Sequence, residues 1–253
     1  LRWDTPIKGL SLTGKAGVTY WTKYDKTYRA ETYFDENKTV GPSTLNIWTS
    51  NNTNTTLEAL VNYEKTFGSH DLKVLAGTSV EQTSNKGLEG YRNTFPNNAL
   101  YQLGAGDAST ATNNSSLEEY ALVSFFGRVN YAFKDKYLLE ANLRYDGSSR
   151  FAKDNRWGIF PSVSAGWRIS EENFWKNTRA GEVVNNLKLR ASYGVLGNQN
   201  IGVYPYQQTY DLDHNYPLGN PATLVPGTYV STYRNQDLTW EKTFTTGIGA
   251  DAA

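Results

Sequence analysis

The sequence contains no cysteine, which excludes a disulfide framework, thiolate metal sites and a cysteine nucleophile. It has two histidines, His70 and His214, which are too few for a multi-histidine metal site. Its 25 basic and 25 acidic residues give a formal net charge of zero, whereas nucleic-acid-binding modules normally carry a basic excess. We therefore expect no metal, no cofactor and no nucleic-acid partner.

Long hydrophobic runs are also lacking. No stretch approaches the roughly 18 consecutive apolar residues of a transmembrane helix. Methionine is absent, and Leu1–Leu10 lacks the apolar core of a signal peptide. We expect either a processed chain or a piece of a longer protein.

Aromatic residues, by contrast, are abundant. They make up 14% of the chain, with 18 tyrosines among them, although the mean hydropathy is −0.60. This composition suits a sugar-binding β-protein, in which rings stack on ligands, or an outer-membrane barrel, in which rings form interfacial girdles. Composition alone leaves both classes open.

Apolar and polar residues alternate with a period of two, which is typical of strands with one apolar and one polar face. The central runs last about 10–15 residues, longer than the roughly 5–6 of an average strand and sufficient for the roughly 9–11 that cross a bilayer. We expect about eight strands in an antiparallel all-β protein: Leu10–Tyr24, Leu57–Tyr63, Leu72–Val80, Ala121–Phe133, Tyr137–Asp146, Trp157–Ile169, Leu187–Val195 and Thr239–Ala250.

The two faces of these strands differ in chemistry. Aromatic residues lie at the ends of the apolar faces, as at two membrane interfaces: Phe133, Tyr137, Tyr145, Trp157 and Trp167. Charged residues lie on the opposite faces and are expected to face the lumen of a barrel: Arg128, Glu140, Arg144, Asp146, Arg168, Lys188 and Arg190.

Short and long connections alternate, which is the layout of outer-membrane barrels with long extracellular loops. Turns are expected at Gly68–Asp71 and Lys134–Lys136, and long loops at Arg29–Thr55, Ser84–Leu117 and Gly197–Leu238. In the longer inner connection that follows Ile169, Ser170 is predicted to N-cap a short helix. The loop residues expected to contact substrate are Trp48, Tyr91, Tyr101, Tyr204, Tyr206, Tyr210, His214 and Tyr216.

The sequence does not indicate an enzyme. Its carboxylate pairs, such as Glu118-Glu119 and Glu171-Glu172, fall in expected loops or turns. Glycosidase acids need opposed carboxylates about 5–9 Å apart in a cleft, and adjacency in the sequence does not supply that. We predict no catalytic residues.

Several motifs follow one another in the middle and at the end of the chain: Phe126-Gly127-Arg128-Val129-Asn130-Tyr131, Arg144-Tyr145-Asp146-Gly147-Ser148-Ser149-Arg150-Phe151, Trp157-Gly158-Ile159-Phe160-Pro161-Ser162, Leu187–Gly194, Gly197-Asn198-Gln199 and Asn235–Thr243. In this order they resemble the SusC/RagA family of TonB-dependent transporters. The motif Asn235–Thr243 has Gln236 where the family usually has proline.

The resemblance implies an outer-membrane β-barrel of 22 strands that holds an N-terminal plug. Residues 1–253 would be a partial barrel domain without the plug. It also implies import of large nutrients, commonly oligosaccharides and in some members peptides. A SusD-like surface lipoprotein would act as the lid, and TonB–ExbB–ExbD would supply energy through the plug.

Two other readings stay open. A secreted β-sandwich carbohydrate-binding module predicts a water-soluble protein whose apolar strand faces meet each other. An adhesin or structural barrel predicts no dependence on TonB. Solubility without detergent separates the sandwich from either barrel.

Overall fold

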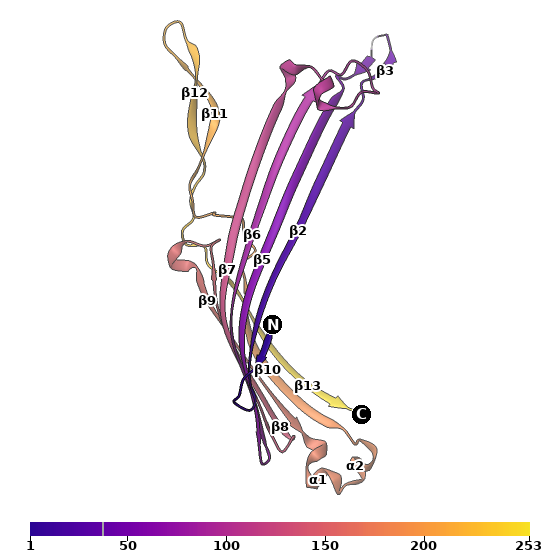
Figure 1. Cartoon of the computed structure of the whole chain (residues 1–253), viewed down its shortest axis with the longest axis vertical. Helices are drawn as coiled ribbons and strands as arrows, with labels where there is room; N and C mark the ends of the chain where they lie inside the picture. Colours follow the sequence, from indigo (N-terminus) through magenta and orange to yellow (C-terminus); the bar gives the residue numbers. More distant parts are fainter. Residues whose placement is uncertain (37) are drawn as a thin grey trace. The chain divides into compact units, whose positions relative to one another are not determined.

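Strands dominate the computed structural model, which describes residues 1–36 and 38–253 (Figure 1). The strands are β1 (Arg2–Asp4), β2 (Leu10–Arg29), β3 (Thr32–Asp35), β4 (Lys38–Val40), β5 (Thr44–Phe67), β6 (His70–Asn93), β7 (Thr112–Phe133), β8 (Tyr137–Ser148), β9 (Trp157–Arg168), β10 (Leu187–Asn198), β11 (Thr209–Leu218), β12 (Thr223–Thr232) and β13 (Glu241–Ala252). The helical turns are η1 (Leu103–Ala105), η2 (Ala108–Thr110), η3 (Lys153–Asn155), η4 (Ile169–Glu171), α1 (Asn173–Lys176) and α2 (Arg179–Val183). Among the described residues, no helix is long and apolar enough to cross a membrane.

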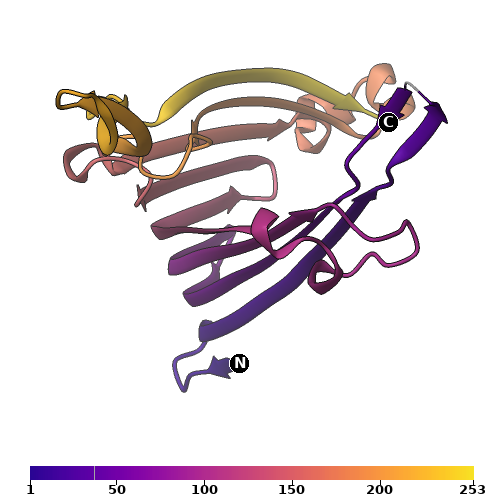
Figure 2. The same ribbon diagram turned by 90° about the horizontal axis from the view of Figure 1, so that it is seen from above.

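One sheet contains nine strands in the order β1-β2-β5-β6-β7-β8-β9-β10-β13. The strands follow one another across the sheet in sequence order, from indigo to yellow in Figure 2. Each of the eight expected strands corresponds to a long strand of this sheet, and β7 through β10 pair antiparallel. The all-β, antiparallel prediction is confirmed.

The strands extend further than predicted. β5 and β6 each have 24 residues, and β7 has 22. Thr44–Thr55, Ser84–Asn93 and Thr112–Leu117, expected in loops, are therefore strand. These segments are mainly polar, and their few apolar residues, such as Leu45, Ile47 and Leu88, do not form a sustained alternation. Side-chain hydrogen bonds link neighbouring strands there, with Ser50 Oγ 2.7 Å from Asn85 Oδ1 and Asn54 Nδ2 2.9 Å from Thr83 Oγ1.

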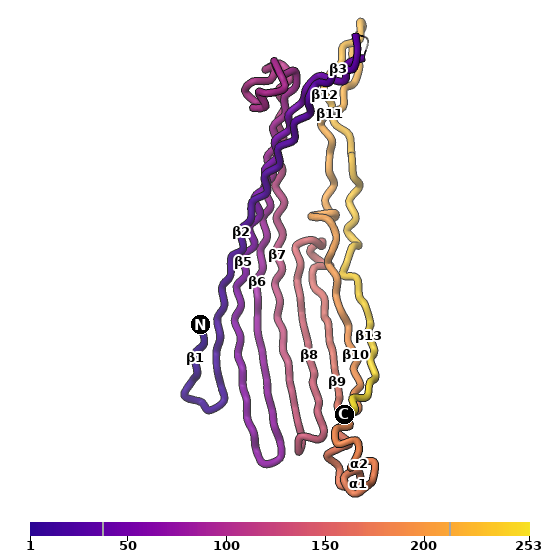
Figure 3. Tube along the Cα trace, turned by 90° about the vertical axis from the view of Figure 1, so that its right-hand side faces the viewer, coloured from indigo at the N-terminus to yellow at the C-terminus, as the bar shows by residue number. Residues whose placement is uncertain are grey.

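The chain divides into two compact units. Unit 1 comprises Leu1–Ala16, Thr56–Glu81 and Ala121–Ala253, and unit 2 comprises Gly17–Thr55 and Gln82–Tyr120. In unit 1 the β5–β6 turn, the β7–β8 turn and the α1–α2 connection lie at one end of the strands, here called the turn end (Figure 3). The opposite end of β8, β9, β10 and β13 is called the loop end.

The apolar face of unit 1 is exposed. Leu139 pairs with Ala165, and Leu143 pairs with Pro161. Leu139, Leu143 and Val163 are 52%, 52% and 50% exposed. A β-sandwich would bury such side chains against a second sheet. The exposed band therefore argues against the sandwich reading.

The helical connection between β9 and β10 differs from the prediction in its cap. Ser170 lies inside η4 and is 5% exposed, while Glu172 is the N-cap residue of α1 and makes no side-chain cap hydrogen bond. Thr178 caps α2 by accepting from the Gly181 amide at 3.2 Å. The predicted Ser170 cap is wrong because Ile169–Glu171 closes into a separate 3₁₀ turn.

Candidate functional site

The charged residues of β7 to β10 share one face of unit 1. The register pairs Arg128 with Asn142 and Glu140 with Ser164, and it is continuous between β7 and β8 and between β8 and β9. Lys188 pairs with Arg168 in the same manner. Because side chains alternate strictly along a strand, this register puts all seven predicted charged residues on one face.

A side-chain network orders the centre of this polar face. Arg128 Nε donates to Asn142 Oδ1 at 2.7 Å. Asn142 Nδ2 donates to Glu140 Oε1 at 2.9 Å and to Ser162 Oγ at 3.3 Å. The network crosses β7, β8 and β9, so it holds a positive and a negative group at defined positions.

Arg144 and Asp146 form the most enclosed ion pair of this face. Arg144 Nε and Nη2 donate to the two carboxylate oxygens of Asp146 at 3.2 and 3.1 Å, and Nη2 also donates to Ser124 Oγ at 3.2 Å. The guanidinium lies 5.2 Å from the centre of the Phe126 ring. Asp146 is 7% exposed, so this two-point contact anchors Arg144 while leaving part of its side chain accessible.

Two hollows lie along the polar face. One, of about 540 Å³, is lined by Arg128, Asn142 and Arg144 together with Lys15 and Glu58, which form an ion pair at 2.8 Å. The other, of about 660 Å³, has a charged lining of Asp71, Lys73, Glu140, Lys188 and Arg190. These sizes and mixed linings suit binding of a polar solute.

Arg168 and Arg190 have polar partners near the turn end. Arg168 Nη1 donates to the carbonyl of Asp135 at 3.3 Å. Arg190 Nη2 lies 3.4 Å from Asp251 Oδ1. In the described part of the chain, no group of three or more His, Cys, Asp or Glu residues is placed to hold a metal ion.

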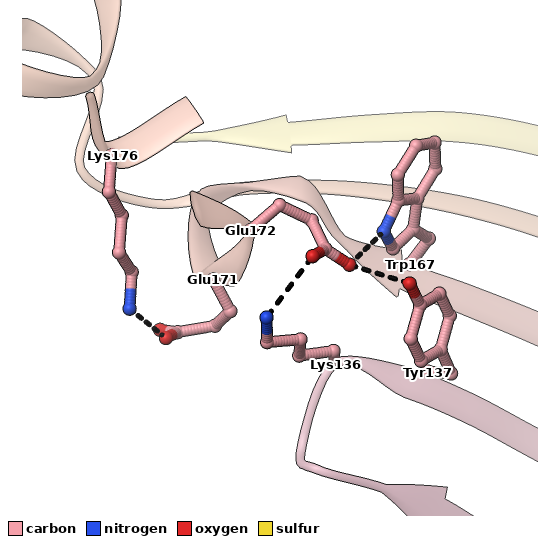
Figure 4. Close-up of polar contacts among 6 residues, drawn as sticks. All are labelled: Lys136, Tyr137, Trp167, Glu171, Glu172 and Lys176. Carbon is pink, nitrogen blue, oxygen red and sulfur yellow. Dashed lines mark hydrogen bonds and ion pairs between the residues drawn. The ribbon is translucent and has the colours of Figure 1, made fainter. Parts of the chain in front are cut away.

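The carboxylates Glu171 and Glu172 lie in the β9–β10 connection at the turn end (Figure 4). Glu172 accepts from Tyr137 Oη at 2.7 Å, from Lys136 Nζ at 3.1 Å and from Trp167 Nε1 at 3.2 Å. These hydrogen bonds, led by that from Tyr137, lower the pKa of Glu172. The hydrogen bond from Lys176 likewise lowers the pKa of Glu171. Glu172 connects the β9–β10 segment to the β7–β8 turn, β8 and β9, whereas Glu171 pairs with Lys176 inside the segment at 2.7 Å.

The predicted substrate-contacting residues occupy several different elements. In unit 2, Trp48 lies on β5 and Tyr91 on β6, so neither is in a loop as predicted. Tyr101 is in the β6–β7 connection, where its ring centre is 5.6 Å from that of Tyr28 and 5.2 Å from Lys26 Nζ.

In unit 1, the expected loop Gly197–Leu238 contains the hairpin β11–β12, a two-stranded ribbon apart from the main sheet (Figure 1). Tyr210, His214 and Tyr216 lie on β11, and the His214 ring is 4.3 Å from that of Tyr229 on β12. Tyr204 and Tyr206 meet edge to face at 6.1 Å in the connection before β11.

Sequence reasoning missed an aromatic cluster at the loop end. Phe151, Phe160 and Trp240 are each at most 6% exposed, and the Trp240 ring lies 5.3 Å from Phe151 and 5.1 Å from Phe160. A Cβ at Gly158 or Gly197 would overlap the Phe160 ring, so both positions require glycine. The signal was present, because these residues belong to the sequence motifs themselves.

The β8–β9 connection, which lies beside this cluster, contacts both ends of the segment that carries β11 and β12. Trp240 Nε1 donates to the carbonyl of Arg156 at 2.8 Å, and Asn155 Nδ2 donates to the carbonyl of Gln236 at 2.8 Å. The Arg150 guanidinium donates to the carbonyl of Ile201. The β8–β9 connection thus supports the base of the hairpin segment.

Comparison with known proteins identifies the family. The family model described as TonB dependent receptor-like, beta-barrel matches residues 2–252. The TonB-dependent receptor SusC of Bacteroides thetaiotaomicron is 38% identical over 199 residues, which cover 76% of this chain and 18% of SusC. TonB-dependent receptor P3 of Formosa agariphila is 36% identical over 204 residues, covering 80% of this chain and 20% of the receptor.

The solved structure of the RagAB peptide transporter superposes with a TM-score of 0.84 at 27% identity, covering 98% of this chain and 26% of that chain. The RagAB peptide importer in its closed-closed state gives the same values. This chain spans about a fifth of the length of the curated relatives it matches. It belongs to the TonB-dependent receptor-like β-barrel family and is of the SusC/RagA type.

Proposed function

We propose that residues 1–253 form part of the wall of an outer-membrane barrel that imports large nutrients with energy supplied through TonB. The observation that carries the proposal is the division of the unit 1 sheet into an exposed apolar face and a charged, networked face. Lipid would cover the first face, and the second would line an aqueous lumen.

The dimensions of the apolar face support a membrane location. On β8, Tyr137 lies at the turn end, and Tyr145 stacks on Trp157 at 4.6 Å near the loop end. The eight residue steps between the two tyrosines span roughly 26 Å along the strand. A tilt of about 40° reduces this to roughly 20 Å, close to the approximately 25 Å apolar band of outer-membrane barrels.

The whole protein would be a 22-stranded barrel with an N-terminal plug, of which this chain supplies about eight strands. Energy from TonB–ExbB–ExbD would reach the barrel through that plug. A SusD-like lipoprotein would cap the loop end. Oligosaccharides are the first substrate candidates, and the similarity to RagAB adds peptides.

The polar face would act on the solute during passage. The seven charged residues would line the lumen, where fixed ion pairs such as Arg144–Asp146 offer hydrogen bonds without a strong net charge. Substrate contacts by the aromatic residues named above would occur before entry. The chain would bind and guide its cargo without breaking covalent bonds.

The test is uptake in living cells. Cells that express the full-length protein should accumulate a fluorescently labelled oligosaccharide or peptide, and removal of TonB should abolish the accumulation. Equal uptake with and without TonB would contradict the proposal and favour a passive barrel. If the protein stays soluble and monomeric without detergent, the result would contradict the barrel and favour the β-sandwich alternative.

A further inference from the structure

An aromatic cluster surrounds His70, the first residue of β6, in unit 1. The His70 ring stacks on that of Phe67 on β5 with the two centres 5.1 Å apart, and it lies 4.8 Å from the ring of Phe133 on β7. His70 Nδ1 is 2.7 Å from Tyr131 Oη. Contacts from both neighbouring strands therefore hold the imidazole in place.

The cluster lies on the apolar face of the sheet, at the turn end. Across β7 and β8, Tyr131 pairs with Leu139 and Phe133 pairs with Tyr137. Directly paired residues share a face, and Leu139 belongs to the exposed apolar face. In the proposed barrel lipid covers this face, and the short turns lie on the periplasmic side. His70 would therefore lie at the periplasmic boundary of the lipid.

Lys134 adds an ammonium group to the cluster. The amide of Lys136 donates to the carbonyl of Phe133 at 3.0 Å and closes the β7–β8 turn, and the amide of Lys134 donates to the carbonyl of Ser69 in the β5–β6 turn at 2.7 Å. Lys134 Nζ lies 5.2 Å from the centre of the Phe133 ring. One ring thus contacts both the ammonium group and the His70 imidazole.

The backbone of this turn is unusual for a lysine. Lys134 and Asp135 both have a φ of 55°. Two successive residues with positive φ form a type I′ hairpin turn, in which asparagine and glycine are preferred. A longer side chain is held there at an energetic cost, and such strained positions often serve a function. The geometry therefore indicates that the Lys134 side chain has a role beyond closing the turn.

The cluster has an excess of cationic groups. Lys65 precedes Phe67 by two residues on β5, so it lies on the same face, roughly 7 Å along the strand. Within the described part of the chain, neither Lys65 nor Lys134 forms an ion pair. The β7–β8 turn contributes one carboxylate, Asp135. Two ammonium groups and an imidazole thus stand against one carboxylate, which favours an anionic ligand.

We infer that this cluster binds the phosphate of an anionic phospholipid, an inference that rests on the proposed membrane location. Lys134 Nζ contacts the phosphate oxygens. When Tyr131 donates to Nδ1 of His70, the Nε2 atom carries the proton and donates to the same phosphate. Nε2 has no hydrogen-bond partner among the residues that the structure describes. Lysines at a membrane surface attract anionic lipids in the same way.

A phospholipid fits the cluster better than a soluble phosphate does. Phe67 is 44% exposed and Tyr137 is 46% exposed, so apolar rings adjoin the cationic groups. A free phosphate would use the cations and leave these rings in contact with water. In a phospholipid the phosphate is joined to apolar chains, so one molecule covers both parts of the surface.

The experiment uses the full-length protein in detergent and native mass spectrometry of its lipid complexes. The probes are dioleoyl phosphatidylglycerol, which is anionic, dioleoyl phosphatidylcholine, which has no net charge, and inorganic phosphate. We expect phosphatidylglycerol to bind at least about 5-fold more tightly than phosphatidylcholine. Lys134→Asn should weaken phosphatidylglycerol binding by about 5-fold, the effect of one lysine at a membrane surface, and change phosphatidylcholine binding by less than about 2-fold.

Lys134→Asn separates binding from folding, because asparagine is a preferred residue in a type I′ turn. Its stability in urea should equal or exceed that of the wild type. His70→Phe keeps an aromatic ring but removes Nε2, and it should weaken phosphatidylglycerol binding by about 3- to 10-fold. Lys153→Ala is the matched control, because it removes an exposed lysine in η3 at the loop end, and it should bind like the wild type.

Three results would overturn the inference. The first is equal phosphatidylglycerol affinity in the wild type and in folded Lys134→Asn or folded His70→Phe. The second is equal affinity of the wild type for the two lipids, which would show that the rings anchor lipid regardless of its charge. The third is displacement of phosphatidylglycerol by millimolar inorganic phosphate, which would replace the lipid by a soluble anion. TonB-dependent uptake would stand in each case, because the cell assay decides it separately.

Discussion

At the scale of single residues, the aromatic cluster at the loop end depends on two glycines, Gly158 and Gly197, which have no side chain and so leave room for the Phe160 ring. Phe160 occupies space that a Cβ at Gly158 or Gly197 would fill, and its ring packs against Trp240. The two glycines lie on adjacent strands, β9 and β10. The packing of one ring therefore requires glycine at one position on each of two neighbouring strands.

Gly197→Ala should lower the free energy of unfolding by about 1–3 kcal/mol, because the added methyl group overpacks the site around Phe160. The loss is measurable by urea titration of the full-length protein in phospholipid vesicles. Gly202→Ala, in the connection that follows β10, is the control, since a Cβ there meets nothing within 4 Å. Equal stability of the two variants would contradict the packing role of Gly197.

Glu172 gives a prediction of pH dependence. Its pKa is lowered below the ordinary 4.5 by hydrogen bonds from Tyr137, Lys136 and Trp167. A carboxyl whose pKa is lower in the folded state stabilises that state fully above its unfolded pKa, and the contribution is lost as pH falls through the folded pKa. Hydrogen exchange of η4 and α1 should therefore accelerate below about pH 4.5 more than in the rest of the sheet.

Glu172→Gln should reduce this extra pH response to the part due to Glu171, and it should raise exchange already at pH 7. Glu182→Gln on α2 is the matched change in the same connection and should keep the wild-type response. An unchanged pH profile in Glu172→Gln would show that other groups control the connection.

At the scale of strands, the same alternation that builds the sheet separates two environments. Leu143 on β8 and Val163 on β9 are half exposed on the apolar face. Ser192 on β10 pairs with Ser164 and lies on the polar face. A change of one residue position along a strand thus exchanges lipid for water in the proposed barrel.

Leu143→Arg and Val163→Arg should each cost about 2–4 kcal/mol in the free energy of unfolding from a bilayer, because each places a charge near the midplane. Ser192→Arg, a change to the same side chain on the polar face, should cost less than about 1 kcal/mol. Similar losses at the three positions would contradict the assignment of the faces.

The β11–β12 hairpin is a separate element whose removal the sheet should tolerate. The amide of Asn235 donates to the carbonyl of Pro205 at 3.1 Å, so the two ends of the segment already meet. Replacement of residues 206–234 by Asn-Gly should change the free energy of unfolding by less than about 1 kcal/mol. Loss of the folded barrel, seen as loss of heat-modifiable migration in gels, would contradict this independence.

At the scale of the whole molecule, the nine-stranded sheet ends in two edge strands. β1 and β13 are the end strands of the nine-stranded order, and an exposed edge invites unwanted pairing unless a barrel closes. The proposed 22-stranded barrel would pair both edges. In that proposal, import, the plug and the lid would belong to the larger protein.

The intact denatured mass of the polypeptide from its native membrane should accordingly be several times the 28.3 kDa of this chain. Mass spectrometry after extraction in detergent provides the measurement. A mass near 28.3 kDa would contradict a single-chain transporter and leave a small barrel unit.

The sequence by itself determined the strand core of unit 1, because the alternation of apolar and polar residues is a local property. It placed β8, β9, β10 and the end of β7 within a few residues, although β7 begins nine residues before the predicted start, and it assigned Arg128 and Glu140 to one face, which the register bears out. The order of the motifs also indicated the family. Each of these conclusions depends on neighbours in the chain or on side-chain parity.

Only the tertiary structure decided what depends on residues far apart in the chain. The polar ends of β5, β6 and β7 became strand through pairing with one another, although they lack the alternation that marks a strand. Trp240 and Phe151 meet although they are 89 positions apart in the chain (240 minus 151), and the Asn46 amide is oriented by Glu89 on the next strand. Such contacts follow from strand pairing, which local sequence patterns do not encode.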